Sequence, residues 1–260
     1  MTHTRTTLSA IVITRNEAHN LHDCLQSMHG LVDEIIVVDS QSTDATVAIA
    51  QQHGAKVAQP ADWPGFGPQK NRALDLATCD WVFSIDADER VTPELAAEIK
   101  QVLQAGMSEV AYKVPRLSSY CGKSIHHAGW QPDYVLRLFK RGTARFSDDL
   151  VHERVVTKTN VLPLQHHLLH YSYLNFSQVL SKVDAYSTAS AMQAYARGKR
   201  SSVAGALGHG AWAFIRTYVI RRGFLDGAHG LALSISNAET SYYKYLKLWQ
   251  MQQAEEAAAK

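Results

Sequence analysis

Short apolar runs alternate with longer amphipathic segments along the N-terminal part of the chain. Strands are predicted at Leu8 to Thr14, Glu34 to Val38 and Lys56 to Gln59, because continuous apolar runs are expected of strands buried on both faces of a parallel sheet. The segments between them carry apolar residues every three or four positions and predict helices. Strands and helices that alternate at this spacing predict βαβ units with right-handed crossovers.

Polar residues mark where several helices begin. Asn16 is predicted to cap the first helix with its side chain. Thr92, Pro93 and Glu94 predict another start, because a capping residue, a proline at the first position and an acid in the first turn all suit a helix N-terminus. Asp226 is predicted to cap the last helix of the chain.

The pattern changes twice further along the chain. Short β-like pieces separated by polar breaks predict strands at Tyr112 to Val114, Tyr134 to Phe139, Ala144 to Phe146 and Val151 to Val156. After Asn175 three helical segments follow. We therefore predict an α/β fold: a Rossmann-like mixed, mostly parallel sheet flanked by helices over residues 1–170, in halves 1–106 and 107–170, with a helical extension over residues 171–260.

Carboxylates follow two of the predicted strands. Asp39 ends the second strand, and the run Trp81 to Ile85 leads into Asp86 and Asp88, whose spacing places both on one side of an extended backbone. Ligands bind at the carboxyl ends of strands in open α/β sheets, and carboxylate oxygens there suit Mg²⁺ or Mn²⁺ carrying a substrate's phosphates. For the Asp-x-Asp pair alone, a solvated turn is an equally good interpretation.

A loop broken by glycine and proline, Trp63 to Pro68, runs into a helix with Lys70 and Arg72 in its early turns. A helix start with nearby cations is a reasonable place for anionic oxygens, although a plain surface connection is the alternative. The loop matches neither the dinucleotide-binding nor the P-loop pattern, which disfavours an NAD enzyme or a P-loop NTPase. His152 and Glu153 predict either a surface pair or a metal ligand beside a general base.

The C-terminal helices have an uneven charge distribution. No acidic residue occurs between Asp184 and Asp226, whereas the same stretch contains Arg197, Lys199, Arg200, Arg216, Arg221 and Arg222 among apolar and aromatic residues. This pattern is typical of a surface that lies on anionic lipid head groups. A helical hairpin packed on the main domain, with a solvated basic edge, explains the same pattern.

Composition adds a cellular setting. The chain has 260 residues, a net charge of +2 and three scattered cysteines, which we interpret as free thiols in a reducing cytoplasm. The polar N-terminus predicts no signal peptide, and no apolar run reaches the roughly 18 to 20 residues of a membrane-spanning helix. We expect a protein that stays in the cytoplasm, on the side of the membrane where it was made, without a nucleic-acid partner.

Four motifs in order resemble the inverting family 2 glycosyltransferases of the GT-A fold. They are Ile11 to Glu17, Asp39 with the Ser-x-Ser-Thr-Asp that follows it, Lys70-Asn-Arg72, and Asp86-Ala-Asp88. Further features look more specifically like bacterial lipopolysaccharide core glucosyltransferases, namely Gly129-Trp-x-Pro-Asp, Arg137-Leu-Phe, Val151-His-Glu and the basic tail. The resemblance implies a UDP-sugar donor, in particular UDP-glucose, and an inner-core heptose on lipid A as acceptor. It also implies a peripheral location on the cytoplasmic face of the inner membrane. A polyprenyl-linked or capsule intermediate is the alternative acceptor.

The resemblance also implies roles for individual residues. Asp88, with His152, would hold Mg²⁺ or Mn²⁺, and Trp130 would stack on an acceptor sugar. The nucleotide sugar would be bound by Arg15, Glu17, Asp39, Lys70, Arg72 and Asp86. Many family members carry a Glu-Asp pair whose Asp is the base, and this sequence has none. Glu153 is our candidate base, with Asp149 and Asp148 as the other available carboxylates.

Two other classes of function fit some of these residues. A haloacid-dehalogenase-type phosphatase also places Asp-x-Asp at a strand tip, but there the pair follows the first strand and here it follows the fourth. A non-catalytic scaffold that binds a sugar nucleotide or a membrane would keep the fold without turnover. Isothermal titration with UDP plus a donor-hydrolysis assay distinguishes the scaffold from a glycosyltransferase, because a scaffold binds UDP but never releases it from a donor.

Overall fold

The computed structural model describes residues 5–106, 110–148 and 153–258. The chain divides into two compact units, which we call the sheet unit (Met1–Arg116 with Asp133–His170) and the helical unit (Leu117–Pro132 with Tyr171–Lys260). The segment Leu117–Pro132 therefore groups with the C-terminal helices. No helix among the described residues is long and apolar enough to cross a membrane.

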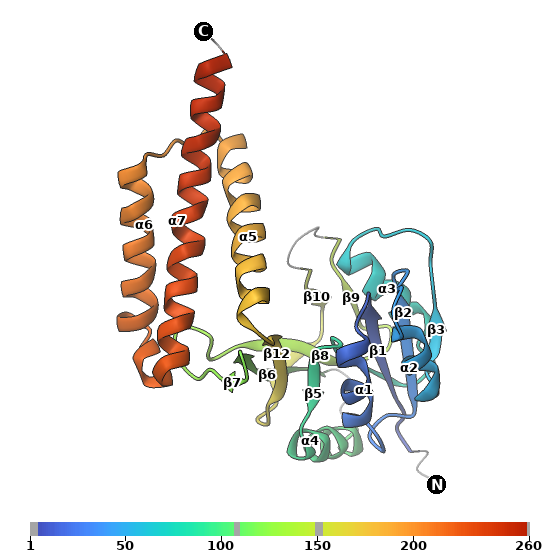
Figure 1. Ribbon diagram of the computed structural model, residues 1–260. Coiled ribbons are helices and arrows are strands. Elements are labelled where there is room, and N and C mark those ends of the chain that lie inside the picture. Colours follow the sequence, from blue (N-terminus) through green and yellow to red (C-terminus); the bar gives the residue numbers. More distant parts are fainter. Residues whose placement is uncertain (1–4, 107–109, 149–152, 259–260) are drawn as a thin grey trace. The chain divides into compact units, whose positions relative to one another are not determined.

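The main sheet is mixed (Figure 1). Its strands are arranged in the order β3-β2-β1-β4-β8-β6-β12-β5. Strands β1 to β4 pair in parallel, whereas β8 is antiparallel to both β4 and β6, and β12 is antiparallel to β5. The strands of this path are β1 (Leu8–Thr14), β2 (Glu34–Asp39), β3 (Lys56–Ala58), β4 (Trp81–Ser84), β5 (Glu89–Val91), β6 (Val110–Tyr120), β8 (Tyr134–Lys140) and β12 (Leu168–Tyr173).

Three shorter pieces complete the strands. β7 (Lys123–Ser124) and β11 (Asn160–Pro163) each pair with β6. β9 (Ala144–Phe146) and β10 (Val155–Thr157) form a separate antiparallel pair. The predicted strand at Val151 to Val156 thus begins later, at Val155, and the residues 149–152 lie outside the described part of the chain.

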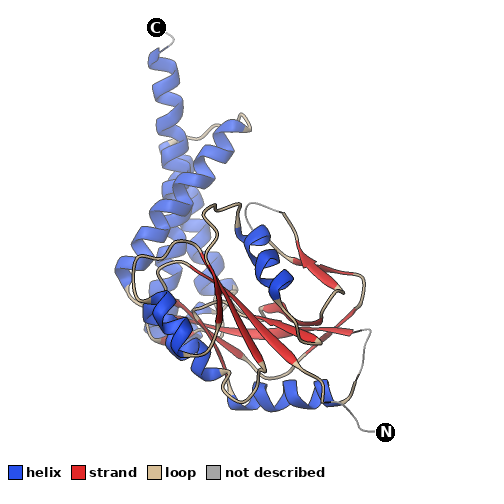
Figure 2. Ribbon diagram, turned by 90° about the vertical axis from the view of Figure 1, so that its right-hand side faces the viewer, coloured by secondary structure: helices blue, strands red, loops and turns tan. Residues whose placement is uncertain are grey.

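Helices cover both faces of the sheet (Figure 2). Alternate residues of β1 separate into two cores, Ala10 and Val12 on one face and Ile11 on the other. The first core is covered by α1 (Ala18–Ser27), α2 (Thr46–Gln52) and α4 (Pro93–Gln104), and the second by α3 (Phe66–Leu76). This two-sided burial explains the continuous apolar runs and confirms the predicted fold class.

The helix starts agree only in part with the sequence. Thr92 caps α4, since its hydroxyl accepts a hydrogen bond from the Leu95 amide at 3.2 Å. Asn16 does not cap α1. It adopts a positive φ of 56°, and its side-chain oxygen accepts from the Thr43 amide at 2.8 Å. Asparagine tolerates this left-handed conformation, so the residue joins two loops at the carboxyl edge of the sheet.

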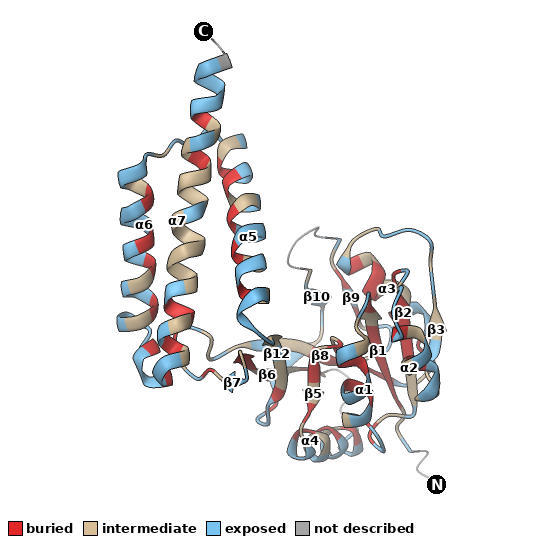
Figure 3. Cartoon of the chain, viewed as in Figure 1, coloured by how far each residue is buried: buried red, intermediate tan, exposed pale blue. Residues whose placement is uncertain are grey.

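The helical unit is built on three long helices, α5 (Phe176–Ala196), α6 (Val203–Ile215) and α7 (Gly227–Ala258). A π-helical turn, η1 (Arg216–Ile220), and a 3₁₀ turn, η2 (Gly223–Asp226), connect α6 to α7. α7 lies between α5 and α6, and buried residues concentrate on the facing sides (Figure 3). Small residues permit close packing there, because a Cβ on Gly210 would lie 3.1 Å from the Cβ of Tyr242.

Asp226 fastens the segment Leu117–Pro132 to the helices. Its buried carboxylate accepts hydrogen bonds from the backbone amides of His126 and His127 at 3.1 and 2.8 Å. The predicted role as a helix cap is therefore wrong. The carboxylate bonds the backbone of a distant loop instead. Capping patterns are local in sequence and do not predict such a contact.

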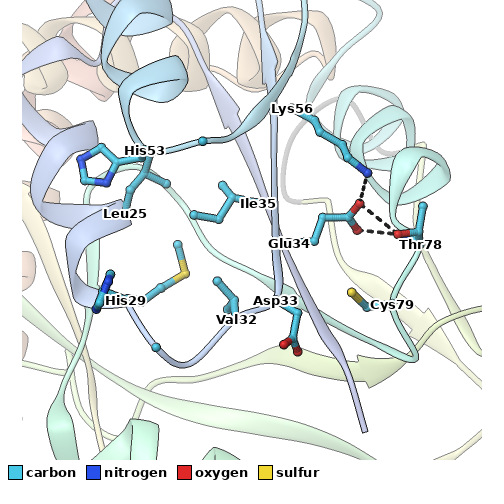
Figure 4. Close-up of a pocket in the computed structure, with 13 residues that line it drawn as sticks. Leu25, His29, Val32, Asp33, Glu34, Ile35, His53, Lys56, Thr78 and Cys79 are labelled. Carbon is cyan, nitrogen blue, oxygen red and sulfur yellow. Dashed lines mark hydrogen bonds and ion pairs between the residues drawn. The ribbon is translucent and has the colours of Figure 1, made fainter. Parts of the chain in front are cut away.

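A pocket lies at the amino ends of β2 and β3, on the edge opposite the strand-end carboxylates (Figure 4). Glu34 extends from its wall, and its side chain is only 7% exposed. The carboxylate accepts hydrogen bonds from Lys56, Ser9 and both donors of Thr78. Burial raises the pKa of Glu34, but these donors outweigh it and lower the pKa to about 2.

We predict that Glu34 makes the fold sensitive to acid. Because its pKa is lower in the folded than in the unfolded chain, its contribution is complete above pH 4.5 and is lost as the pH falls through about 2. Glu34→Gln should lower the free energy of unfolding at pH 7 by about 2–3 kcal/mol. Lys56→Met should lower the free energy of unfolding by less, since Ser9 and Thr78 still donate to Glu34. Urea unfolding at pH 7 and pH 3 measures both; equal losses for the two variants at pH 7 would contradict this assignment.

Candidate active site

The carboxyl ends of β1, β2 and β4 meet at one edge of the sheet and carry the first group of polar side chains. Asp39, the last residue of β2, is fully buried. Its carboxylate accepts hydrogen bonds from the Thr14 hydroxyl at 2.9 Å and from the amide and hydroxyl of Ser42 at 2.9 and 2.5 Å. Gln59 approaches it at 3.3 Å. The side chain is thus fixed by the loops around it.

Asp86 lies just beyond β4 and is held by two cations. Lys70 Nζ lies 2.9 Å from Oδ1, and an Arg137 guanidinium nitrogen lies 2.5 Å from Oδ2. The carboxylate remains 31% exposed, so its outer side faces solvent. Burial raises the pKa of Asp86, but the charges of Arg137 and Lys70 outweigh it and hold the pKa far below the ordinary value. The two cations therefore favour the ionised form of Asp86.

Glu89 is the second carboxylate that contacts Arg137. Its side chain has no exposed surface, and it lies 2.6 Å from Arg137. It also accepts a hydrogen bond from the Asp86 amide at 2.9 Å, which fixes the turn that carries the Asp-x-Asp pair. Burial raises the pKa of Glu89; the charge of Arg137 opposes this rise, and the neighbouring charge of Asp86 adds to it. One guanidinium thus connects two carboxylates and orients the exposed one.

Asp88, Glu17 and His170 lie together on the other side of this turn. His170 Nε2 is 3.3 Å from Asp88 Oδ2. Burial raises the pKa of Glu17, which accepts a hydrogen bond from Asn20, and the charge of Asp88 raises it further. His170 comes from β12, where it pairs with Glu89 across the sheet.

The residues at this edge fit a divalent cation held partly by substrate. Asp88 offers a carboxylate oxygen and His170 an imidazole nitrogen. In the described part of the chain no cluster of three or more His, Cys, Asp or Glu residues could hold a metal by itself. Mg²⁺ and Mn²⁺ that carry phosphates typically need only one or two protein carboxylates, since phosphates and waters complete the shell. His152 lies outside the described residues.

Glu153 enters the site from the β9–β10 hairpin. Its side chain is 18% exposed, and Oε1 lies 2.9 Å from Lys70 Nζ. The same ammonium therefore contacts Glu153 and Asp86, which brings carboxylates 67 positions apart in the chain into one site. Asp148 is exposed at the start of the hairpin tip, and Asp149 lies outside the described residues.

The other predicted site residues are more scattered. Arg15 is exposed just after β1. Arg72 contacts Asp62 at 2.7 Å and Gln69 at 3.0 Å. Trp130 belongs to the helical unit, where its ring stacks on Tyr173 with the ring centroids 6.1 Å apart. Their predicted contacts with nucleotide and acceptor stay predictions.

Three residues of the site were not assigned roles from the sequence: Arg137, Glu89 and His170. Arg137 had a visible signal, because it is the charged residue in the apolar run Tyr134 to Phe139 and a buried cation requires an anionic partner. Glu89 and His170 had no such signal in the sequence. Their positions depend on the pairing of β5 with β12, which brings together segments about eighty residues apart.

Comparison with known proteins gives the family of this chain. A model of glycosyl transferase family 2 matches residues 9–162. The chain is 32% identical over 252 residues to an uncharacterized glycosyltransferase of Rickettsia felis, covering 93% of this chain and 89% of the relative. It is 34% identical over 204 residues to the lipopolysaccharide core biosynthesis glycosyltransferase LpsC of Rhizobium meliloti, covering 74% and 73%. The protein belongs to glycosyl transferase family 2 and has its GT-A fold.

Solved structures give partial matches. TarS of S. aureus aligns with a TM-score of 0.48 and 17% identity, over 64% of this chain and 37% of that chain. Glucosyl-3-phosphoglycerate synthase of Mycobacterium tuberculosis, solved with Mn²⁺, UDP and glucosyl-3-phosphoglycerate, aligns with a TM-score of 0.38 and 28% identity, over 44% of each chain.

Arg137 should dominate the stability of this edge. Arg137→Met leaves Glu89 buried without its closest counter-charge, and we predict a loss of about 3–5 kcal/mol in the free energy of unfolding. Arg145→Ala removes an exposed ion pair with Asp75 and should change the free energy of unfolding by less than about 1 kcal/mol. Urea unfolding of both variants checks the difference. Similar values for the two would mean that Glu89 is not charged in the folded protein.

Proposed function

We propose that this glycosyltransferase transfers a hexose, glucose from UDP-glucose, onto an inner-core heptose of lipopolysaccharide with inversion. The observation that carries the proposal is the meeting of Asp86 and Glu153 at Lys70. It brings a carboxylate at a strand end and a carboxylate of the β9–β10 hairpin into one site, which supports a donor side at the first and an acceptor side at the second. The similarity to LpsC supports the choice of acceptor.

The donor side is formed by the ends of the parallel strands. Asp39 would accept the imide N–H of uracil, and Glu17 would bind ribose hydroxyls. Asp88 and His170 would hold Mg²⁺ or Mn²⁺, which when bound neutralises charge that develops on the diphosphate leaving group. Asp86, kept anionic by Arg137 and Lys70, would bind the ribose or a metal-bound water.

The acceptor side provides a base. In a direct displacement the acceptor hydroxyl oxygen forms a bond to the anomeric carbon while the bond to the UDP oxygen breaks, and UDP leaves with the electron pair. Glu153 takes the hydroxyl proton, and attack from the face opposite UDP inverts the configuration. A positioned base typically contributes ~10² to 10⁴ in rate.

We also propose that the helical unit contacts an anionic membrane surface, where a lipid-linked acceptor would be met. The turn between α6 and α7 exposes apolar and basic side chains side by side: Val219, Ile220, Arg221, Arg222, Phe224 and Leu225. Exposed apolar residues flanked by arginines favour the interface of a bilayer with anionic lipids. The cytoplasmic face of the inner membrane would provide such a surface for the helical unit.

The metal and base assignments predict distinct kinetic defects. Asp88→Asn, and separately addition of EDTA, should remove most transfer from UDP-glucose. Glu153→Gln should lower kcat by ~10² or more, while the Kd for UDP measured by calorimetry stays within twofold. Asp148→Asn, in an exposed residue of the same hairpin, is the matched control and should remain active. If Asp149→Asn is inactive and Glu153→Gln is not, Asp149 is the base.

Membrane binding should depend on both charge and apolar contact. The protein should sediment with vesicles that contain phosphatidylglycerol, much less with pure phosphatidylcholine, and less again at high salt, because salt screens the arginines. Phe224→Ser combined with Leu225→Ser should weaken binding at least fivefold. Leu76→Ser, at an exposed apolar residue of the sheet unit, is the control. Equal binding to both vesicle types would contradict the proposed surface.

A further inference from the structure

Helix α3 holds the β9–β10 hairpin through its side chains. The Asn71 amide donates to the Phe146 carbonyl at 2.9 Å and accepts from the Phe146 amide at 2.9 Å, so it bonds both backbone groups of one residue. One turn earlier, the backbone of Gly67 lies against the Ser147 carbonyl, and a methyl group at position 67 would overlap that oxygen. The helix thus fixes the end of β9 at two successive residues.

Hydrogen bonds within the hairpin connect the end of β9 to the backbone next to Glu153. Ser147 and Arg154 are joined by two hydrogen bonds, one from the Ser147 amide to the Arg154 carbonyl at 2.9 Å and one from the Arg154 amide to the Ser147 hydroxyl at 3.1 Å. Glu153 directly precedes Arg154. Its backbone is therefore registered to α3 through Ser147, and its side chain is held by Lys70 from the same helix.

Lys70 has little capacity left for a substrate. An ammonium group has three donors, and Nζ already contacts Asp86 and Glu153 at 2.9 Å each. The side chain is only 8% exposed, and the Phe146 ring lies 5.7 Å from Nζ on another side. A cation with these neighbours is shared between two protein carboxylates.

We propose that Lys70 and Asn71 are positioning residues for the base: they aim Glu153 at the acceptor side and join it to Asp86, and Lys70 does not serve as a ligand of the donor's diphosphate. The inference rests on the proposed function, because it assigns the support of the proposed base. It replaces the role expected for Lys70 from the sequence. Asn71, which had no assigned role, gains one.

A double-mutant comparison separates the two roles of Lys70. Lys70→Met keeps the length of the side chain and removes its charge. If Lys70 positions Glu153, Lys70→Met lowers kcat at least tenfold, leaves the Kd for UDP within about threefold, and adds little to the defect of Glu153→Gln in the double variant. If Lys70 binds the diphosphate, the Kd for UDP rises tenfold or more and the two defects multiply, which overturns the proposal.

Asn71 gives an independent test, because its side-chain hydrogen bonds among the described residues both go to the Phe146 backbone. Asn71→Ala should lower kcat at least fivefold with the KM for UDP-glucose unchanged. Asn71→Asp keeps the acceptor for the Phe146 amide and should recover part of the loss. Arg145→Ala, which breaks an exposed ion pair between α3 and the same hairpin, is the matched control and should keep wild-type kcat. Thermal unfolding confirms that each variant is folded at the assay temperature.

The outcomes distinguish this inference from the proposed function. A wild-type protein that neither binds UDP nor transfers glucose contradicts the proposed function. A wild-type protein that does both, with wild-type kcat in Asn71→Ala and tenfold weaker UDP binding in Lys70→Met, contradicts the positioning role alone.

Discussion

The site depends on one buried interaction, the ion pairs of Arg137 with Asp86 and Glu89. A buried guanidinium is stable only with anionic partners, and Glu89 is fully buried beside it. Glu89 also accepts a hydrogen bond from the Asp86 amide, which ties the turn after β4 to the same buried carboxylate. Asp86 lies at the carboxyl edge of the sheet, where Arg137 and Lys70 both favour its ionised form.

The second dependence is on helix α3, which covers one face of the sheet and also contacts the β9–β10 hairpin. Its apolar residues Ala73 and Leu74 pack in the same core as Phe146. Its polar residues Lys70 and Asn71 contact Glu153 and the backbone of β9. The helix thus contributes both to the hydrophobic core and to the arrangement of the site.

Much of this arrangement is visible in the sequence. Asp39 and Asp86 were predicted at strand ends because their strands are continuous apolar runs, and the carboxyl ends of parallel strands share an edge. The pairings across long sequence distances could not be predicted. Asp226 bonds His126 and His127 instead of capping a helix, and Asn16 joins a loop. A local pattern shows what a side chain can bond but not which distant segment is near.

The choice of base shows the same limit. The sequence offers Asp148, Asp149 and Glu153 as equivalent carboxylates, and among the described residues the contact of Glu153 with Lys70 distinguishes it. Because family 2 membership is established by sequence, the open question is the chemistry of transfer to the acceptor.

The most direct measurement is the structure of the product. The purified protein is incubated with UDP-glucose, Mg²⁺ and truncated core lipopolysaccharide that ends in the inner-core heptose, and the product is analysed by mass spectrometry and NMR. The account predicts a gain of one hexose on that heptose, with an anomeric configuration opposite to that of the donor. Retained configuration, or UDP binding without any sugar transferred to this or another acceptor, would contradict it.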